Sequence, residues 1–181
     1  YESEALAWEQ AAFIRSRASA GDRALGAQFL AAIQPFIWRR SLDFRQLREI
    51  GAMSDRIRDH FAQGQAFGPG YDLKRGRGGI REIEFFAQVH QLIYGGRDPS
   101  LRVPATVDAL AALAAAGRVE ADVAARLSGH YATLRRIEHR LQMVEDQQTH
   151  GLPVQPAALD GVARLDGLAD GAALLAMLEP V

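Results

Sequence analysis

Cysteine is absent from this sequence, and so is any long hydrophobic run. Without cysteine the chain can form neither disulfides nor thiolate metal sites, and we expect a reducing cytoplasm as its compartment. No apolar stretch reaches the roughly 18–20 residues that a membrane-spanning helix needs. The net charge of the 181 residues is −1 at pH 7, so the basic excess of a general nucleic-acid binder is missing as well. The sequence therefore predicts no membrane and no nucleic acid as partners.

Known catalytic motifs are also missing. No GxxxxGK[ST] loop occurs, because Lys74 precedes its glycines and neither Ser nor Thr follows them. The histidines are scattered without metal-ligand spacing, and there is no GxSxG nucleophile elbow. Glu82 and Glu84 stand two residues apart on a predicted helix, where about 200° of rotation separates them, so they cannot hold one metal ion together. We expect no catalytic residue and no metal site in this chain.

The dominant feature that the sequence does have is helical periodicity, with almost no strand pattern. We predict an all-α fold, an antiparallel helical bundle with one long glycine-rich loop (63–79) before a central helix. The predicted domain is a single one over 1–181, with a core at about 3–153 and weaker C-terminal helices in 154–181, cut from a larger protein. The expected helices span about 3–18, 22–34, 43–61, 80–94, 104–116, 120–148, 156–165 and 170–179.

Two of these helices carry specific expectations. Asp22 is expected to cap the second helix, and Pro35 to end it by starting a connector. The side chains expected to face inward from this helix are Leu25, Phe29, Leu30 and Ile33. In the helix at 80–94, the expected polar stripe is Arg81, Glu84, Gln88 and Gln91, and the expected apolar stripe is Phe86, Val89 and Ile93.

The stretch LKRGRGGIREIEF (73–85) admits two interpretations. Glycines before a helix let backbone N–H groups converge on a phosphate, aided by the helix dipole and by the cations Lys74, Arg75, Arg77 and Arg81. The alternative is an ordinary loop followed by a helix whose first turn is capped by Glu82. Lys74 is the only lysine beside 20 arginines, which favours a specific use of its compact charge.

The stretch LRRIEHRLQMVEDQQTHGLP (134–153) is the second candidate. It can be an amphipathic helix whose arginines are solvated and whose Glu138 pairs with neighbours three or four residues away. Alternatively, Arg135, Arg136 or Arg140 faces a partner or the same phosphate site. His90 and His130 lie beside apolar stripes, and we expect them to be packed rather than to act as ligands.

These two stretches resemble a known family. LKRGRGGIREIEFFAQVHQLIYGGRDPSLR (73–102) and the stretch 134–153, together with WEQAAFIRSRASAGD and PFIWRRSLDF, are similar to the bifunctional glutamine synthetase adenylyltransferase/adenylyl-removing enzymes. The resemblance covers most of residues 5–155, and GGIREIEF resembles the N-terminal, adenylyl-removing half. In that family a helical domain follows each nucleotidyltransferase domain, and PII uridylyltransferase shares the helical domain.

The resemblance implies a function. The family adenylylates a tyrosine of glutamine synthetase with ATP, and removes the AMP by phosphorolysis to release ADP. Mg²⁺ and ATP or ADP would bind in the full-length enzyme, with catalytic carboxylates upstream of this chain. The residues of this chain that would face nucleotide or phosphate are Lys74, Arg77, Gly78, Gly79, Arg81, Glu82 and Glu84, with Arg135, Arg136 and Arg140 as secondary candidates. Glu84 would fix Arg81 from three residues away.

Two alternatives remain open. The domain could be a non-catalytic module that docks glutamine synthetase, the PII signal protein or the other half of the enzyme. It could also be the equivalent domain of PII uridylyltransferase. On each interpretation the isolated chain is expected to be inactive, with no cofactor bound and its own nucleotidyltransferase domains as partners.

Overall fold

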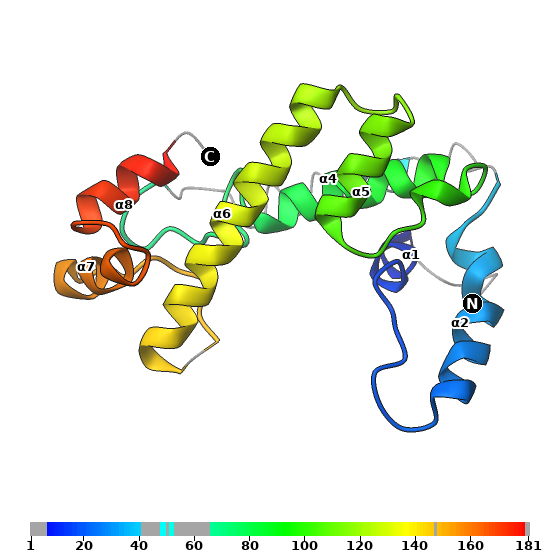
Figure 1. The fold of residues 1–181 in the computed structure, drawn as a ribbon, viewed down its shortest axis with the longest axis horizontal. Coiled ribbons are helices and arrows are strands. Elements are labelled where there is room, and N and C mark those ends of the chain that lie inside the picture. The colour runs from blue at the N-terminus through cyan, green and yellow to red at the C-terminus, as the bar shows by residue number, and fades with distance from the viewer. Residues whose placement is uncertain (1–6, 41–47, 50, 53–65, 147, 180–181) are drawn as a thin grey trace. The chain divides into compact units, whose positions relative to one another are not determined.

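A computed structural model describes residues 7–40, 48–49, 51–52, 66–146 and 148–179. Within these residues the chain is all-α, as predicted, and the only strand-like pairing described is an isolated bridge between Asp72 and Gly151. That it is an antiparallel bundle stays a prediction. The described α-helices are α1 (Ala7–Phe13), α2 (Arg23–Ile37), α4 (Ile80–Tyr94), α5 (Thr106–Ala115), α6 (Ala121–Glu145), α7 (Pro156–Leu165) and α8 (Gly171–Leu178), with a 3₁₀ turn η1 at Pro99–Leu101 (Figure 1).

Most predicted helices are confirmed. The bounds of α4 and α7 are those predicted, and α5, α6 and α8 fall within a few residues of theirs. The first helix was predicted to reach about residue 18, but α1 ends at Phe13 because the chain turns there, with the Ser16 N–H donating to the Phe13 carbonyl at 3.0 Å. The predicted helix at 43–61 lies largely outside the described residues.

Helix α2 confirms one prediction and corrects two. The Asp22 carboxylate accepts hydrogen bonds from the N–H groups of Ala24 and Leu25 at 2.9 and 3.0 Å, which is the predicted N-cap. Pro35 does not end the helix, which runs on to Ile37 although proline donates no N–H. Leu25 is 62% exposed and Phe29 is 48% exposed, so the predicted inward face is wrong at these positions. The buried side of α2 lies at its C-terminal end instead, at Ile33, Phe36 and Ile37.

The chain divides into two compact units. Unit 1 comprises Tyr1–Asp55 and Glu84–Ala125, and unit 2 comprises Arg56–Ile83 and Arg126–Val181. The single domain over 1–181 stays a prediction. None of the helices in the described part of the chain is both long and apolar enough to cross a membrane.

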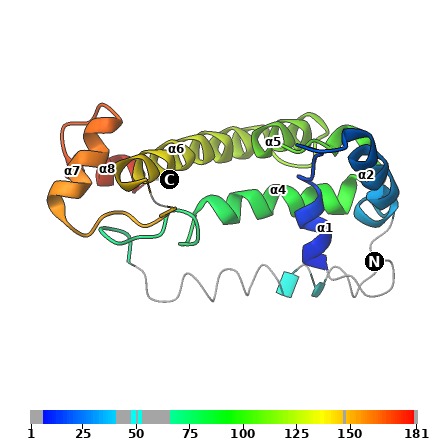
Figure 2. The same ribbon diagram turned by 90° about the horizontal axis from the view of Figure 1, so that it is seen from below.

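In unit 1, α1 packs against α2, and the two lie side by side (Figure 2). The Gln10 amide donates to the Phe36 carbonyl at 2.9 Å across this contact. Gln91, predicted on a polar stripe, is buried, and its amide nitrogen donates to the carbonyls of Leu101 and Val103 at 2.7 Å each. This amide therefore fixes the chain around η1 against α4, which hydrophobic patterning could not reveal.

In unit 2, α7 packs against α8, as Figures 1 and 2 also show. A Cβ on Gly171 would lie 2.7 Å from the Cγ of Leu159, so glycine lets α8 begin close to α7. The Gly171 N–H donates to the Asp160 carboxylate at 2.8 Å, and the Asp170 side chain caps α8. The helices of 154–181, predicted to be weaker, thus have a defined contact and two side-chain bonds at their junction.

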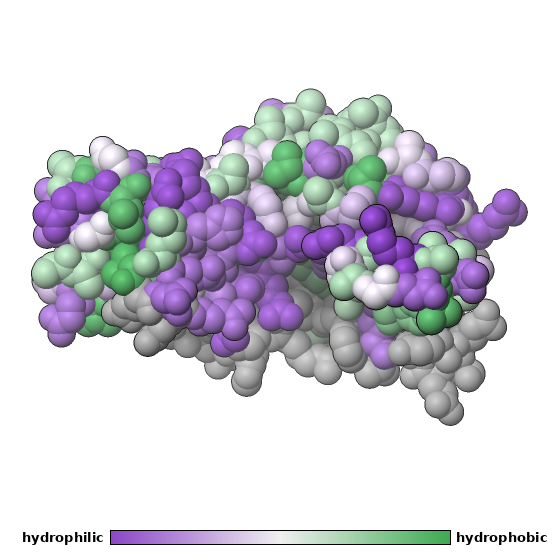
Figure 3. All heavy atoms as spheres, turned by 60° about the horizontal axis from the view of Figure 1, so that its bottom comes forward, coloured by the Kyte–Doolittle hydropathy of each residue, from purple (hydrophilic) through white to green (hydrophobic). Residues whose placement is uncertain are grey.

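Exposed apolar side chains are spread over several elements. Figure 3 shows hydrophobic residues in small separate patches among hydrophilic ones on the face that it presents. The large hydrophobic side chains that are exposed among the described residues are Leu25, Phe29, Phe67, Val107, Met143, Val144, Val154 and Leu165. Scattered exposure of this kind is normal for a protein surface and marks no site by itself.

Candidate phosphate-facing site

The two sequence stretches singled out above meet in unit 2 through their backbones. The N–H of Leu73 donates to the His150 carbonyl, the N–H of Leu152 to the Tyr71 carbonyl, and the N–H of Gly70 to the Leu152 carbonyl, each at 2.9 Å. Together with the antiparallel bridge between Asp72 and Gly151, these bonds fix the glycine-rich loop beside the segment that follows α6. Lys74 is thereby placed next to α6.

The backbone N–H groups of the loop are largely used within the loop itself. The Asp72 carboxylate accepts from the N–H groups of Lys74 and Arg75, both at 2.9 Å, as in an Asx turn. The first N–H groups of α4, at Ile80 and Arg81, donate to the carbonyls of Leu73 and Lys74 at 2.9 and 3.0 Å. These N–H groups are therefore already hydrogen-bonded and do not form a phosphate-binding site at the start of α4. Any phosphate contact here falls to side chains.

Two glycines of the loop are explained by its own packing. A Cβ on Gly79 would lie 2.7 Å from the Gly76 carbonyl oxygen and 2.8 Å from that of Leu73. Gly78 adopts a φ of 76°, in the left-handed region that favours glycine. These glycines let the loop fold back on itself, which accounts for them without a ligand.

The two glutamates of α4 have separate roles. The Glu82 carboxylate accepts from the Gly78 N–H at 3.0 Å, which confirms the predicted capping of the first turn. Glu84 lies 2.7 Å from Nη1 of Arg15, to which it is both ion-paired and hydrogen-bonded in unit 1. The described ion pair of Glu84 is with Arg15, whereas Arg81 was the expected partner. Arg81 itself is exposed.

The centre of the site is the Glu138 cluster, formed by Lys74, Arg135, Glu138 and His150. The predicted pairing of Glu138 with a neighbour three residues away is confirmed, but the carboxylate is buried, with only 1% of the residue exposed. Its Oε2 accepts a hydrogen bond from Nη1 of Arg135 at 2.6 Å, three residues earlier on α6. Its Oε1 lies 3.7 Å from Nζ of Lys74 and 2.8 Å from Nδ1 of His150.

The Oε1 side of this carboxylate is incompletely satisfied. Oε1 of Glu138 and Nδ1 of His150 are close, but their angles give neither atom a regular hydrogen bond within the described part of the chain. A buried carboxylate without cationic partners would be costly, so the positive charges of Lys74 and Arg135 stabilise Glu138 in the core. In turn, Glu138 holds the Lys74 ammonium group, whose side chain is 29% exposed, at the edge of unit 2.

The other two candidate arginines of α6, Arg136 and Arg140, have a different partner. Nε of Arg136 lies 2.8 Å from Oδ1 of Asp166, the C-cap residue of α7, and Nε of Arg140 lies 3.8 Å from the same oxygen. These contacts tie α6 to the end of α7, which is a structural role. The structure therefore brings Arg135 to Lys74 and directs Arg136 and Arg140 to Asp166.

A pocket of about 200 Å³ lies beside the loop. Its lining residues are Phe67, Tyr71, Leu73, Arg77, Gly78, Gly79, Leu134, Leu178 and Glu179. Burial, and then the negative charges of Glu82 and Asp72, raise the pKa of Tyr71, while Arg77 opposes this. The hydroxyl therefore stays protonated and donates to the Arg77 carbonyl. This bond fixes the backbone at Arg77, whose exposed side chain borders the pocket.

The pairing of Glu138 along the helix was predicted, but its burial was not, and His150 was not singled out as a candidate. Glu138 follows Leu134 by four residues and precedes Leu141 by three, so it falls on the buried stripe of α6, and this spacing could have revealed it. His150 gave no such signal, because its place depends on the backbone pairing with Leu73. Among the described residues, no group of three or more His, Cys, Asp or Glu side chains is arranged so that it could hold a metal ion.

The class of protein follows from comparison with known families. A family model described as GlnD PII-uridylyltransferase matches residues 50–179, which include the loop, α6 and the Glu138 cluster. The chain belongs to this family.

Individual relatives narrow the class. A bifunctional glutamine synthetase adenylyltransferase/adenylyl-removing enzyme from Caulobacter vibrioides is 52% identical over 167 residues, which are 92% of this chain and 17% of that protein. Proteins of the same name from Xanthobacter autotrophicus and Bradyrhizobium diazoefficiens are 48% and 46% identical, each across 100% of this chain and 19% of the relative. The chain thus spans less than a fifth of the length of these relatives.

Proposed function

We propose that this chain is the helical domain of an enzyme that adenylylates a tyrosine of glutamine synthetase and removes the AMP by phosphorolysis in nitrogen regulation. In this proposal the domain supports an adjacent nucleotidyltransferase domain and presents Lys74 to a phosphate group in its cleft. Relatives of 46–52% identity named for these activities support the proposal over the uridylyltransferase alternative. Glutamine synthetase and the PII signal protein are the proposed partners of the whole enzyme.

The observation that supports this site most strongly is the buried Glu138 beside a partly exposed Lys74. The Lys74 ammonium group lies 3.7 Å from Oε1 of Glu138, and 29% of its side chain remains open to solvent. A cation held from behind by a buried carboxylate has a restricted position and still carries a face for a second anion. Such preorganisation lowers the cost of ordering the side chain when a phosphate binds.

The chemistry explains why a cation is useful there. In phosphorolysis an oxygen of inorganic phosphate forms a bond to the phosphorus of the tyrosine-linked AMP, and the bond from that phosphorus to the tyrosine oxygen breaks. The products are ADP and a tyrosine hydroxyl, which takes up a proton. Two negatively charged phosphate groups must approach each other, so positive charge near them lowers the barrier. Lys74 is proposed to supply part of that charge, with Arg77 and Arg81, both exposed, adding to the local field.

Magnesium and nucleotide are proposed to bind mainly to the neighbouring domain. Mg²⁺ would be held by carboxylates of that domain and would supply positive charge that stabilises the phosphate groups during transfer. Residues of this chain are proposed only to bind and orient phosphate from the open side of that site. Glu82 and Glu84 are occupied by the Gly78 N–H and by Arg15, so they are poorly placed to add carboxylate ligands.

The test uses an enzyme in which this domain is joined to its nucleotidyltransferase domain. Lys74→Ala is compared with Arg126→Ala, which removes an exposed cation from α6 outside the Glu138 cluster. We expect Lys74→Ala to lower kcat/KM for phosphorolysis about tenfold or more, because it removes a contact that strengthens in the transition state. Arg126→Ala is expected to leave kcat/KM within about twofold.

The alternative of a docking module predicts a different outcome. If Lys74 serves only to satisfy Glu138, its replacement lowers stability while the folded fraction retains normal kcat for both reactions. If the domain only docks glutamine synthetase or PII, the variant changes the KM for the protein substrate, or the response to PII, and leaves the KM for inorganic phosphate unchanged. Either result would refute the proposed phosphate contact.

A further inference from the structure

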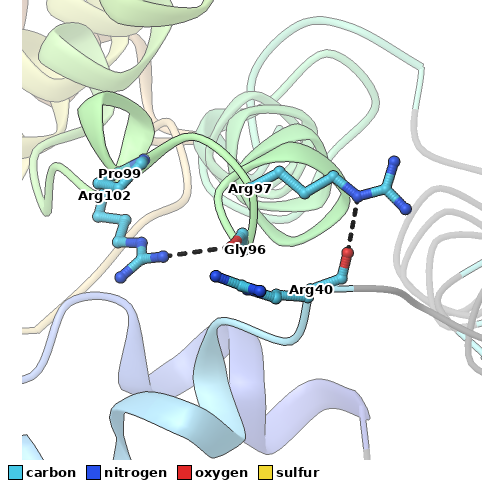
Figure 4. Close-up of a pocket in the computed structure, with 5 residues that line it drawn as sticks. All are labelled: Arg40, Gly96, Arg97, Pro99 and Arg102. Atoms are coloured by element: carbon cyan, nitrogen blue, oxygen red, sulfur yellow. Dashed lines mark hydrogen bonds between the residues drawn. The ribbon is translucent and has the colours of Figure 1, made fainter.

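A second cationic feature lies in unit 1, away from the Glu138 cluster in the sequence. Arg40, Arg97 and Arg102 line a hollow of about 520 Å³ together with Gly96 and Pro99 (Figure 4). Its lining contains three arginines and no carboxylate. Among the ion pairs of the described residues, none involves these three arginines. The hollow is therefore lined by three arginines that form no ion pair with a described carboxylate.

The backbone of the hollow is closely fitted. A Cβ on Gly96 would lie 1.8 Å from the Arg39 carbonyl oxygen, so only glycine lets the two segments approach this closely. Nε of Arg97 donates to the Arg40 carbonyl at 2.9 Å and stabilises the contact between the same two segments. The position of Arg40 relative to Gly96 is thus fixed by the backbone and does not depend on the Arg40 side chain.

Arg102 is held in a defined orientation. Its Nε donates to the Gly95 carbonyl at 2.7 Å, and its Nη2 lies 3.4 Å from the Gly96 carbonyl. Its guanidinium carbon lies 5.6 Å from the centre of the buried Trp38 ring. In Figure 4 the side chain of Arg40 extends toward the same side as that of Arg102, whereas Arg97 points away. Arg40 and Arg102 are therefore the two that can bind one ligand together.

We propose that this hollow binds the phosphate or carboxylate group of a small molecule through the Arg40 and Arg102 guanidinium groups. Arginine does not lose its proton at physiological pH, so charges gathered here cannot be relieved by deprotonation. Guanidinium groups match the geometry of an oxyanion and bind it with paired hydrogen bonds. The volume lies within the roughly 300–1,000 Å³ typical of small-molecule sites, so the hollow accommodates a ligand larger than a bare anion.

The test follows the arginine Nε–Hε signals of the 181-residue chain by NMR during titration with sodium phosphate or sodium citrate, with sodium chloride holding the ionic strength constant. Arg40→Gln removes one proposed ligand and keeps the carbonyl that Arg97 needs. Arg39→Gln is the matched control, because it removes the same charge one residue away, where the guanidinium lies over Phe36 at 5.7 Å from the ring centre. Circular dichroism checks that both variants remain folded.

We expect a saturable shift of the Arg102 signal, an affinity at least about fivefold weaker in Arg40→Gln, and a change of less than about twofold in Arg39→Gln. Stronger binding of phosphate would assign a phosphoryl ligand, and stronger binding of citrate a carboxylate ligand. The proposal is overturned if neither anion gives a saturable shift up to about 50 mM. It is also overturned if both variants weaken binding equally, since diffuse surface charge would then explain the effect.

Discussion

Replacing Glu138 by glutamine removes the charge at the centre of the Glu138 cluster while keeping the shape of the side chain. In the wild-type chain Arg135 donates to the Glu138 carboxylate at 2.6 Å, whereas the variant offers Arg135 only a neutral acceptor. A hydrogen bond to a charged group contributes about 1.5–3 kcal/mol and a neutral one about 0.5–1.5 kcal/mol, so this bond alone weakens by about 1–2 kcal/mol. Lys74 loses its counter-charge as well.

The loss is limited because the cations are accessible to water. The side chains of Lys74 and Arg135 are 29% and 31% exposed, so both can be partly rehydrated when the carboxylate is lost. We therefore expect the free energy of unfolding to fall by about 1–3 kcal/mol, below the 3–5 kcal/mol typical for breaking a fully buried ion pair. Urea unfolding followed by circular dichroism at pH 7 measures it.

A matched control is Glu120→Gln, which makes the same chemical change on an exposed side chain just before α6. It is expected to change the free energy of unfolding by less than about 0.5 kcal/mol. A double-mutant cycle with Arg135→Gln isolates the direct bond, and the two effects should be less than additive. A loss for Glu138→Gln no larger than that of the control would refute the argument that this carboxylate organises the site.

Further stability predictions concern two residues of the loop, with a glycine of α6 as a comparison. Gly79→Ala places a Cβ within 2.8 Å of two backbone carbonyl oxygens and should destabilise the chain by about 1–3 kcal/mol. Gly129→Ala in α6 adds a Cβ that meets no atom of a neighbouring residue within 4 Å, and it should stabilise the chain by about 0.5–1 kcal/mol. Thermal unfolding midpoints that shift in the same direction for both variants would contradict these two predictions. Tyr71→Phe removes the hydrogen bond to the Arg77 carbonyl and should lower the free energy of unfolding by about 1 kcal/mol at pH 7. Because burial raises the pKa of Tyr71 in the folded state, its contribution is fully present below the unfolded pKa of about 10 and is lost as the pH rises from there through the folded pKa. Urea unfolding at pH 9 and pH 11 should therefore show a steeper loss in wild type than in Tyr71→Phe, and equal slopes would contradict the burial argument.

The helices could be predicted from sequence because their apolar spacing and their end signals agree. Asp22 caps α2 as predicted, and α4 starts after glycine and ends before Gly95 and Gly96. The face of α2 was harder, since Leu25 and Phe29 fit an apolar stripe and yet are exposed. Periodicity tells which residues share a face of a helix, but it does not tell which part of that face another element covers.

The candidate site could be predicted only in part for the same kind of reason. The sequence marked Lys74 and Arg135 as charged residues in two distinctive stretches, but their meeting depends on the backbone bonds of Tyr71 and Leu73 with the distant residues 150–152. The occupation of the loop amides also depends on how the loop folds back, which composition does not determine. The spacing of Glu138 from Leu134 and Leu141 indicates a buried position, but a glutamate among arginines also fits a solvated helix face.

The central claim is that Glu138 positions Lys74 toward a phosphate group. The most direct test is a double-mutant cycle on kcat/KM for phosphorolysis, with inorganic phosphate as the varied substrate, in an enzyme that joins this domain to its nucleotidyltransferase domain. The assay is run where circular dichroism shows every variant to be folded. The account predicts that Glu138→Gln lowers kcat/KM about fivefold when Lys74 is present and less than about twofold when Lys74 is alanine. Equal effects of Glu138→Gln in both backgrounds, or no effect of Lys74→Ala, would contradict it.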